Sequence, residues 1–265
     1  MVRKVILTSQ NYHSIEANRH YMSNSQFKSF EECEAKTMAE LSGAFIAPSN
    51  DNFLLGSYVH AYVEGTLDQF KESTPELFNN KGQLYAKYEV GDAMIQTIKN
   101  DEFIQFVLQG EKELIMTAEL FGVHWKVKLD VLNQQRGRIA DLKTVKGLRE
   151  RYWNKEYGAY ESFIEHYKYI RQMAIYAEVE RVVNGRENWL EPLIVAVSKE
   201  SVPDKAVIGF DADRLKVELD EVAEKIGHII EVKRGLVEPR HCGQCAYCKR
   251  IKKLRSITHY SDLAV

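Results

Sequence analysis

The chain has 265 residues, which is enough for one large domain with a full core. It is 45% hydrophobic and 28% charged with only 5 prolines, a composition that excludes a disordered or fibrous protein. The net charge of −2 excludes a chain that is basic throughout, so any surface for a polyanion must be local. Two segments have the required charge: residues 126–155, with nine basic and three acidic side chains, and the basic run at residues 249–255.

The N-terminal segment bears on cellular location. Residues 1–8 hold two basic residues and an apolar run too short for a signal peptide, and no later segment is long and apolar enough to cross a bilayer. We therefore expect a cytoplasmic protein with no membrane partner. Because the cytoplasm is reducing, its cysteines are expected to be metal ligands or free thiols and not disulfides.

Helices dominate the first hundred residues. Residues 25–41 place apolar side chains at helical spacing and predict one helix that buries one face. After a polar loop, residues 56–64 predict a second helix, with Val59 and Val63 one turn apart and His60 beside them. A third helix is predicted over residues 85–98.

Strands follow the helices. Residues 113–121, 124–132 and 138–144 are short runs with apolar alternation, separated by turns at Gly122 and at residues 134–137, and they predict a three-stranded antiparallel meander. The remaining elements are a helix, a strand bounded by Pro192, a short possible strand, and a helix with one apolar stripe, at residues 160–183, 193–198, 207–210 and 213–233.

This order predicts an α/β fold in a single domain. Residues 56–210 would form its core, preceded by an N-terminal segment at residues 1–55. Residues 211–265 would add a C-terminal helix and a cysteine-containing tail.

The main chemical signal lies on the second and third predicted strands. Asp141 and Lys143 are two residues apart in a strand and project to the same face, while Leu142 points to the opposite layer. The turn between the strands brings Asp130 alongside them. Two converging carboxylates can hold Mg²⁺ or Mn²⁺, and a nearby ammonium can activate or orient a water for attack on a phosphodiester.

A surface salt bridge is the alternative interpretation of the Asp-Leu-Lys triplet. The apolar residues Ile139 and Ala140 before it indicate a core-bound strand, where charge without a partner or a task is costly. The position of the triplet therefore favours a functional site.

The order helix, three strands, helix, strand, with D-x10-D-x-K on strands two and three, resembles the core of the PD-(D/E)xK nucleases. Two further motifs are similar to the RecB-like and RecE-like branches: residues 56–60 of the predicted upstream helix, with His60 as a metal ligand, and Gln172 with Tyr176 in a Q-x3-Y pattern. The N-terminal segment from Tyr21 to Cys33 resembles phage RecE-like DNA exonucleases. The resemblance covers roughly residues 12 to 255.

This resemblance implies a metal-dependent exonuclease that digests linear double-stranded DNA from a 5′ end in phage-type recombination. It also implies double-stranded DNA ends as the binding partner, a ring-shaped homo-oligomer, a single-strand-annealing recombinase as a further partner, and the cytoplasm of a bacterial host.

The resemblance also assigns roles to residues. Lys143 would activate the water, and Gln172 and Tyr176 would help to hold the active site and the DNA strand. The ligands of the Mg²⁺ or Mn²⁺ would be His60, Asp130, Asp141 and the Leu142 carbonyl. The chain departs from many relatives, which carry Glu at position 141, so the shorter Asp141 must place its oxygen closer to the backbone.

The cysteines form a second constellation. Cys242, Cys245 and Cys248 have C-x2-C-x2-C spacing, and Cys33 is the remaining candidate for a fourth ligand. This spacing suits a 4Fe–4S cluster or a four-cysteine zinc site. One remote N-terminal cysteine with three at the C-terminus is similar to the iron–sulfur site of AddB-type nucleases, although the last spacing there is usually longer. Free thiols in a surface tail are the third alternative.

Two other functions fit the same sequence. One is a RecB-like nuclease of the CRISPR-adaptation kind, which also combines this core with four cysteines, and the other is a non-catalytic DNA-binding module on the same fold. Glu64 and Glu119 are additional carboxylates that could supplement the metal ligands, although a structural role is the simpler interpretation of both.

Overall fold

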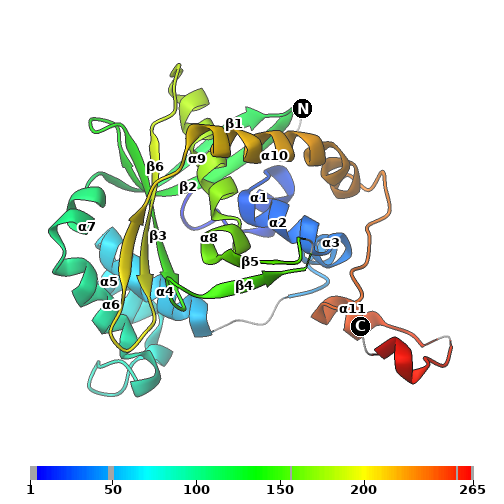
Figure 1. Cartoon of the computed structure of the whole chain (residues 1–265), viewed down its shortest axis with the longest axis horizontal. Helices are drawn as coiled ribbons and strands as arrows, with labels where there is room; N and C mark the ends of the chain where they lie inside the picture. Colours follow the sequence, from blue (N-terminus) through cyan, green and yellow to red (C-terminus); the bar gives the residue numbers. More distant parts are fainter. Residues whose placement is uncertain (1–4, 47–50, 156, 255, 264–265) are drawn as a thin grey trace.

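The computed structural model describes residues 5–46, 51–155, 157–254 and 256–263 (Figure 1). Its centre is a five-stranded sheet in the order β1-β2-β3-β6-β7. The strands are β1 (Glu111–Leu120), β2 (Val123–Asn133), β3 (Arg138–Val145), β6 (Glu191–Ser198) and β7 (Lys205–Ile208). No helix within the described ranges is long and apolar enough to span a membrane.

The pairing of the strands follows the predicted order. β1, β2 and β3 form an antiparallel meander, β6 runs parallel to β3, and β7 is antiparallel to β6 at the edge of the sheet. The predicted meander and the strand after the long helix are therefore confirmed. The parallel pairing places the carboxyl ends of β3 and β6 side by side, with Val145 opposite Ser198.

Helices cover both faces of the sheet, and each face has its own apolar core (Figure 1). On one face pack α2 (Asn24–Glu32), α9 (Tyr169–Val183) and α10 (Ala212–Lys233). On the other pack α4 (Asp51–Glu64), α6 (Val90–Lys99) and α7 (Glu102–Val107). Alternation along β3 divides its side chains, so that Ile139 and Val145 lie in the first core and Ala140 and Leu142 in the second.

The helix predicted over residues 25–41 is wrong, because two helices replace it. α2 ends at Glu32, and α3 (Glu34–Ser42) begins directly after Cys33. Cys33 is extended, with φ −167° and ψ 104°, and its sulfur accepts a hydrogen bond from the Lys36 amide as an N-cap. The apolar spacing did not reveal that the helix is interrupted at Cys33, because α2 and α3 each bury apolar side chains at helical spacing.

The helix predicted over residues 160–183 begins too early. Its first residues belong to a small hairpin of β4 (Arg151–Asn154) and β5 (Ala159–Ser162). The short helix α8 (Phe163–His166) follows, with Ser162 and Glu165 forming a capping box. Lys168 then adopts a left-handed conformation, φ 59°, that separates α8 from α9.

Other elements extend or supplement the prediction. The helix predicted at residues 56–64 begins earlier, at Asp51, and the one at residues 85–98 divides into a 3-10 turn and α6. The sequence did not predict the short elements α1 (Ile15–His20), α5 (Leu67–Ser73), η1 (Pro75–Leu77), α11 (Ala246–Ile251) and η3 (Tyr260–Leu263).

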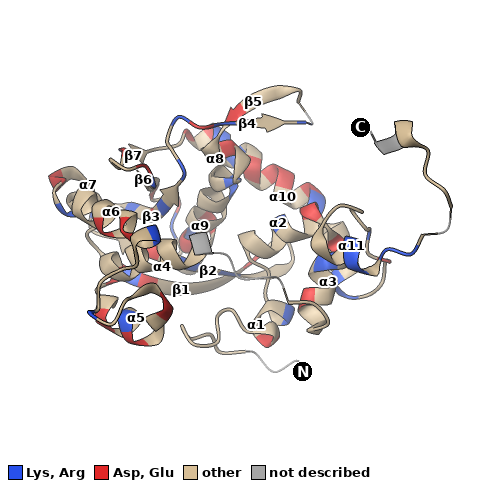
Figure 2. Ribbon diagram, turned by 90° about the horizontal axis from the view of Figure 1, so that it is seen from below, with Lys and Arg blue, Asp and Glu red and all other residues tan. Residues whose placement is uncertain are grey.

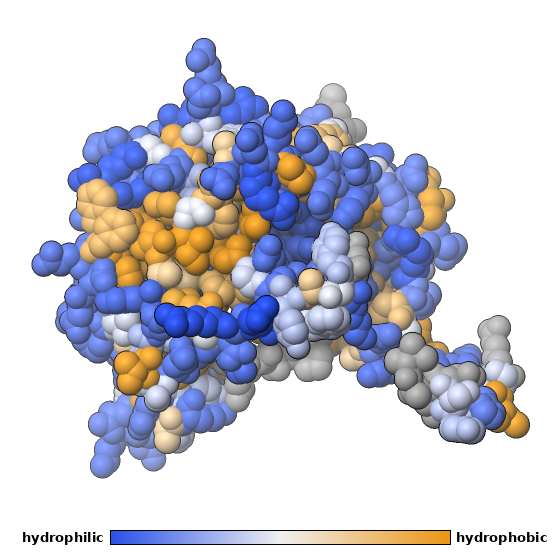
Figure 3. Space-filling model, in the orientation of Figure 1, coloured by the Kyte–Doolittle hydropathy of each residue, from blue (hydrophilic) through white to orange (hydrophobic). Residues whose placement is uncertain are grey.

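Charge and apolarity are unevenly distributed on the surface. Figure 2 shows basic residues on the segment between β3 and β4 and around α11, and acidic residues along α10. Figure 3 shows a patch of apolar residues on the face that carries β6 and β7. The basic segment expected at residues 126–155 includes most of β2 and all of β3, where Lys126 and Arg138 are buried, whereas the second basic run begins on α11.

Candidate active site and metal centres

The two aspartates lie on adjacent strands where the pairing between β2 and β3 ends. Val131 pairs with Ala140, so the next positions, Asp130 and Asp141, face each other across the two strands. Asp130 Oδ2 accepts a hydrogen bond from the Leu142 amide at 2.8 Å. The carboxylate thus takes a main-chain donor at the point where the strands separate, which fixes its position.

Three further side chains converge on these carboxylates. Lys143 Nζ lies 2.6 Å from Asp141 Oδ2, and Gln172 Nε2 donates a hydrogen bond to Asp141 Oδ1 at 2.9 Å. His60 Nδ1, from α4, lies 3.4 Å from Asp130 Oδ2. The structure therefore brings together five of the site residues predicted from the sequence, from two helices and two strands.

The remaining predicted residues lie around this group. Tyr176 stands one turn after Gln172 on α9, and burial, followed by the charge of Asp141, raises the pKa of Tyr176 well above its usual value. Leu142 lines the same cleft, although its side chain points to the opposite core as predicted. Metal binding by the Leu142 carbonyl stays a prediction.

Five of these residues line an open cleft of about 1430 Å³: His60, Asp130, Leu142, Lys143 and Gln172. Asp141 lies below the surface of the cleft, in contact with Lys143 and Gln172. Asp141 is 1% exposed and Asp130 9% exposed, so both carboxylates are deep in the protein. Burial raises the pKa of each aspartate to about 6, although the positive charge of Lys143 opposes this shift. Two buried carboxylates side by side therefore favour a bound cation that would offset their charge.

The other titratable groups are in the forms that such a site needs. Burial, and then the positive charge of Lys143, lowers the pKa of His60 to about 4, which keeps the imidazole neutral and able to bind a metal. Burial lowers the pKa of Lys143, but Asp141 and Asp130 outweigh it, so the net shift is upward and Lys143 is protonated. An ammonium, a neutral imidazole and two carboxylates thus share one cleft.

The sequence missed one carboxylate of this cleft. Glu113 of β1 lines the cleft and forms an ion pair with Lys128, which also lines it. Glu113 has φ 54°, which is uncommon for a residue that is not glycine, and this conformation was not predictable from its position in a strand. Glu64 also lines the cleft, whereas Glu119 is exposed and lies outside it.

The four cysteines meet at a second place. Their sulfur atoms all lie within 4.8 Å of one another, with Cys33 Sγ 3.6 Å from Cys248 Sγ and 3.8 Å from Cys245 Sγ. Cys33 comes from the junction of α2 and α3, and Cys245 caps α11. The structure therefore joins the N-terminal and C-terminal segments of the chain at these thiols.

The environment of the sulfurs suits a cation. The Cys245 amide donates a hydrogen bond to Cys242 Sγ at 3.3 Å. This hydrogen bond is the main reason why the pKa of Cys242 is lowered to about 6. Burial raises the pKa of Cys248 to about 12. The Cys248 thiol therefore ionises only beside a positive charge, which a metal ion supplies.

Comparison with known proteins places the fold. The profile of a family described as "PDDEXK-like domain of unknown function (DUF3799)" matches residues 23–251. The chain belongs to the PD-(D/E)xK superfamily. This confirms the superfamily and the α/β fold class predicted from the sequence.

This PD-(D/E)xK protein is also similar to a solved structure along its whole length. A crystal structure described as "Putative exonuclease" from Eubacterium rectale is 36% identical, covers 98% of both chains and superposes with a TM-score of 0.90. A crystal structure of SSO0001 covers 83% of this chain and 94% of its own, with 14% identity and a TM-score of 0.30, which is too low to relate the two folds. No curated protein matches the chain.

The donor atoms fit the divalent ion that the PD-(D/E)xK fold implies. Asp130 and Asp141 offer hard carboxylate oxygens, and His60 offers a neutral nitrogen on the same cleft wall. Such an ion, when bound, would lower the pKa of a water and neutralise charge that develops on the attacked phosphate.

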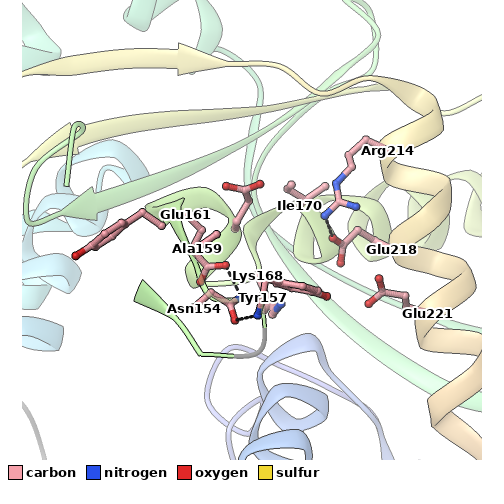
Figure 4. A pocket seen from close by; sticks show the side chains of 11 residues that line it. Asn154, Tyr157, Ala159, Glu161, Lys168, Ile170, Arg214, Glu218 and Glu221 are labelled. Atoms are coloured by element: carbon pink, nitrogen blue, oxygen red, sulfur yellow. Dashed lines mark hydrogen bonds and ion pairs between the residues drawn. The ribbon is translucent and has the colours of Figure 1, made fainter. Parts of the chain in front are cut away.

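A smaller hollow of about 360 Å³ lies between the β4–β5 hairpin and α10 (Figure 4). Four glutamates line it, and Lys168 and Arg214 are its cations, with Arg214 paired to Glu218 at 2.6 Å. An acidic surface of this kind repels phosphate groups. The hollow therefore marks a side of the hairpin that nucleic acid would avoid.

Proposed function

We propose that this PD-(D/E)xK protein is a metal-dependent DNA nuclease, and specifically an exonuclease. The observation that carries the proposal is the convergence of Asp130, Asp141 and Lys143, with His60 and Gln172, at the base of one cleft. The 36% identical structure from Eubacterium rectale is described as "Putative exonuclease", and this description supports the proposal of exonuclease activity.

The geometry suggests a task for each side chain. Asp130, Asp141 and His60 would hold a Mg²⁺ or Mn²⁺ ion, and Lys143 would orient the attacking water and stabilise negative charge on the phosphate. Gln172 donates a hydrogen bond to Oδ1 of Asp141, and Lys143 contacts Oδ2 of the same carboxylate. The hydrogen bond from Gln172 therefore fixes the orientation of the Asp141 carboxylate.

The role of Lys143 gives a test that separates chemistry from metal binding. We expect Lys143→Met to bind Mn²⁺ with affinity similar to the parent, because the lysine does not ligate the metal. Cleavage should fall about 100-fold or more, in the range found for loss of one preorganised charge donor. Manganese binding by isothermal titration calorimetry and cleavage of labelled DNA measure the two effects.

The matched control is Lys146→Met, because Lys146 is a cation of the same cleft whose side chain is 75% exposed and pairs with Glu150. Lys146→Met should change cleavage by a few-fold at saturating DNA. Equal losses in the two variants would contradict the assigned role of Lys143.

The direction and the substrate of the proposed exonuclease follow the resemblance to phage RecE-like DNA exonucleases. We expect linear double-stranded DNA to be shortened from its ends, starting at a 5′ end, while covalently closed circles survive. Gel analysis of both substrates with Mg²⁺, using DNA labelled at either end, measures the preference and the polarity. Efficient cutting of circles would favour an endonuclease, and binding without cutting would favour the non-catalytic module.

The cysteine cluster is proposed to hold one zinc ion. Four sulfurs around a tetrahedral zinc, with bonds of about 2.3 Å, lie about 3.8 Å apart. The separations of 3.6 Å and 3.8 Å at Cys33 match this value. The thiolates of a 4Fe–4S cluster bind four different iron atoms and need more space between the sulfurs. The distances therefore favour zinc over the iron–sulfur cluster that the sequence spacing favoured.

The partners follow from the resemblance alone. A ring-shaped homo-oligomer and a single-strand-annealing recombinase remain predictions. The apolar patch on the face with β6 and β7 is a surface that a second copy could cover (Figure 3). Light scattering coupled to gel filtration gives the oligomer mass, and the mass of a single chain would exclude the ring.

A further inference from the structure

One wall of the active-site cleft is made of three tyrosines. Tyr152 comes from β4, Tyr167 from the junction after α8, and Tyr169 from the start of α9, and all three line the cleft. The ring centroids of Tyr152 and Tyr167 are 5.4 Å apart, and those of Tyr167 and Tyr169 are 5.6 Å apart. We call this continuous surface the tyrosine wall.

The tyrosine wall begins at the proposed reaction centre. Lys143 Nζ lies 4.8 Å from the centroid of the Tyr169 ring, over its face. Tyr152, at the other end, belongs to the β4–β5 hairpin, where its neighbours Arg151 and Trp153 are exposed. The wall therefore leads from the catalytic lysine towards solvent.

Contacts behind the wall hold the rings in place. The Tyr152 ring stacks on His166 with a centroid distance of 4.3 Å, and His166 Nδ1 is 3.1 Å from Glu161. The Tyr167 hydroxyl donates to the Tyr152 hydroxyl at 3.4 Å. Aromatic surfaces fixed in this way lose little conformational entropy when a ligand stacks on them.

Positive charge accompanies the wall. Lys28 Nζ of α2 lies 5.4 Å from the centroid of the Tyr167 ring. Lys146 and Lys199 line the cleft where β3 and β6 end, and the Lys199 amide donates to the Val145 carbonyl at 2.7 Å. The carboxylates Glu64 and Glu113 gather with Lys128 near His60. The cleft thus combines lysines and aromatic faces along the tyrosine wall, which suits phosphates and bases together.

We propose that the tyrosine wall stacks the bases of an unpaired DNA strand, so that the end of a linear duplex must be unpaired at the point where the nuclease cuts it. The inference rests on the proposed function and names its substrate class. Bases within a duplex stack on their neighbours and offer no free face to a side chain, whereas unpaired bases do. The burial of Asp130 and Asp141 adds a steric argument, because a phosphate must descend into the cleft to reach them.

The proposal predicts binding that requires no catalysis. In EDTA, a single-stranded oligonucleotide carrying the fluorescent adenine analogue 2-aminopurine near its end should bind and lose fluorescence through stacking, and a blunt duplex should bind more weakly. Loss of one stacking aromatic costs about 1–3 kcal/mol per base, so Tyr167→Ala should weaken single-strand binding about 5- to 150-fold. Tyr167→Phe keeps the ring and loses only the hydroxyl contact to Tyr152, so it should bind much more tightly than Tyr167→Ala.

Tyr85→Ala is the matched control, because Tyr85 is 47% exposed and lies outside the cleft. With Mg²⁺ present, Tyr167→Ala should raise KM for DNA with unpaired ends and leave kcat within a few-fold of the parent. DNA with unpaired ends should also be a better substrate than blunt DNA. Circular dichroism shows whether each variant is folded, and Tyr152→Ala provides a second probe of the same surface.

Unchanged binding in both Tyr167→Ala and Tyr152→Ala, or equal quenching with blunt duplex, would overturn the proposal. This outcome is distinguishable from failure of the proposed function. If stacking is observed but no DNA is cleaved with Mg²⁺ or Mn²⁺, the tyrosine wall stands and the nuclease assignment fails. If DNA is cleaved without stacking, the reverse holds.

Discussion

Asp141→Asn is expected to lower the rate of DNA cleavage by at least about 1000-fold, which corresponds to about 4 kcal/mol of transition-state stabilisation. Asp141 is the carboxylate that both Lys143 and Gln172 contact, so its charge holds the ammonium and would bind the metal. Asparagine has nearly the same shape but no charge. Single-turnover cleavage of labelled linear DNA with Mg²⁺ measures the loss, and Mn²⁺ titration should show weaker metal binding.

Asp213→Asn is the control for this experiment, because Asp213 is an exposed aspartate in the first turn of α10. It should cleave like the parent. Thermal unfolding followed by circular dichroism must show that Asp141→Asn is folded. Parental cleavage by folded Asp141→Asn would remove Asp141 from the active site and with it the proposed mechanism.

Cys33→Ser is expected to lose the metal of the cysteine cluster and to melt about 10–20 °C lower than the parent. A metal at the four cysteines closes a loop of 215 positions between Cys33 and Cys248. By analogy with long disulfide loops, such closure contributes about 5 kcal/mol, and each kcal/mol shifts the melting temperature of a protein of this size by about 2–4 °C. Elemental analysis should find one zinc per chain in the parent and none in the variant.

The parent stripped of metal by a strong chelator is the matched comparison for Cys33→Ser. The two should melt together, and the chelator should not change the melting of the variant. If the parent is brown and contains iron and sulfide, the cysteines hold an iron–sulfur cluster instead of zinc. The N-terminal and C-terminal segments are then still joined through the metal centre. If elemental analysis finds neither metal and Cys33→Ser melts like the parent, the four cysteines are free thiols.

Local patterns predicted the parts of the site that depend on strand alternation. The two-residue spacing of Asp141 and Lys143 predicted a shared face, and the turn before Arg138 predicted that Asp130 lies beside them, as the structure shows. The helical motifs with His60 and Gln172 were also predicted to lie at this site, and the structure places both side chains beside the aspartates. These relations hold because the geometry of a strand or helix fixes the direction of its side chains.

Parts that depend on irregular backbone were not predictable. The left-handed Glu113 enters the cleft from a strand, and the extended Cys33 interrupts what the apolar spacing describes as one helix. Tyr167 and Tyr169 of the tyrosine wall belong to a segment predicted as one helix, and Tyr152 lies on β4, which was not predicted. Alternation and helical period carry no information about such junctions, because both assume that the backbone continues in one conformation.

α2 connects the two centres of the molecule. It ends at Glu32, directly before Cys33, and its residue Lys28 lines the cleft. Its Glu31 pairs with the buried Arg171 at 2.5 Å, and the next residue on α9, Gln172, holds Asp141. A disturbance at the cysteines therefore has a short mechanical path to the reacting carboxylate. Loss of a metal from the cysteines would therefore act through α2 on Lys28 in the cleft and on the Glu31–Arg171 pair beside Gln172.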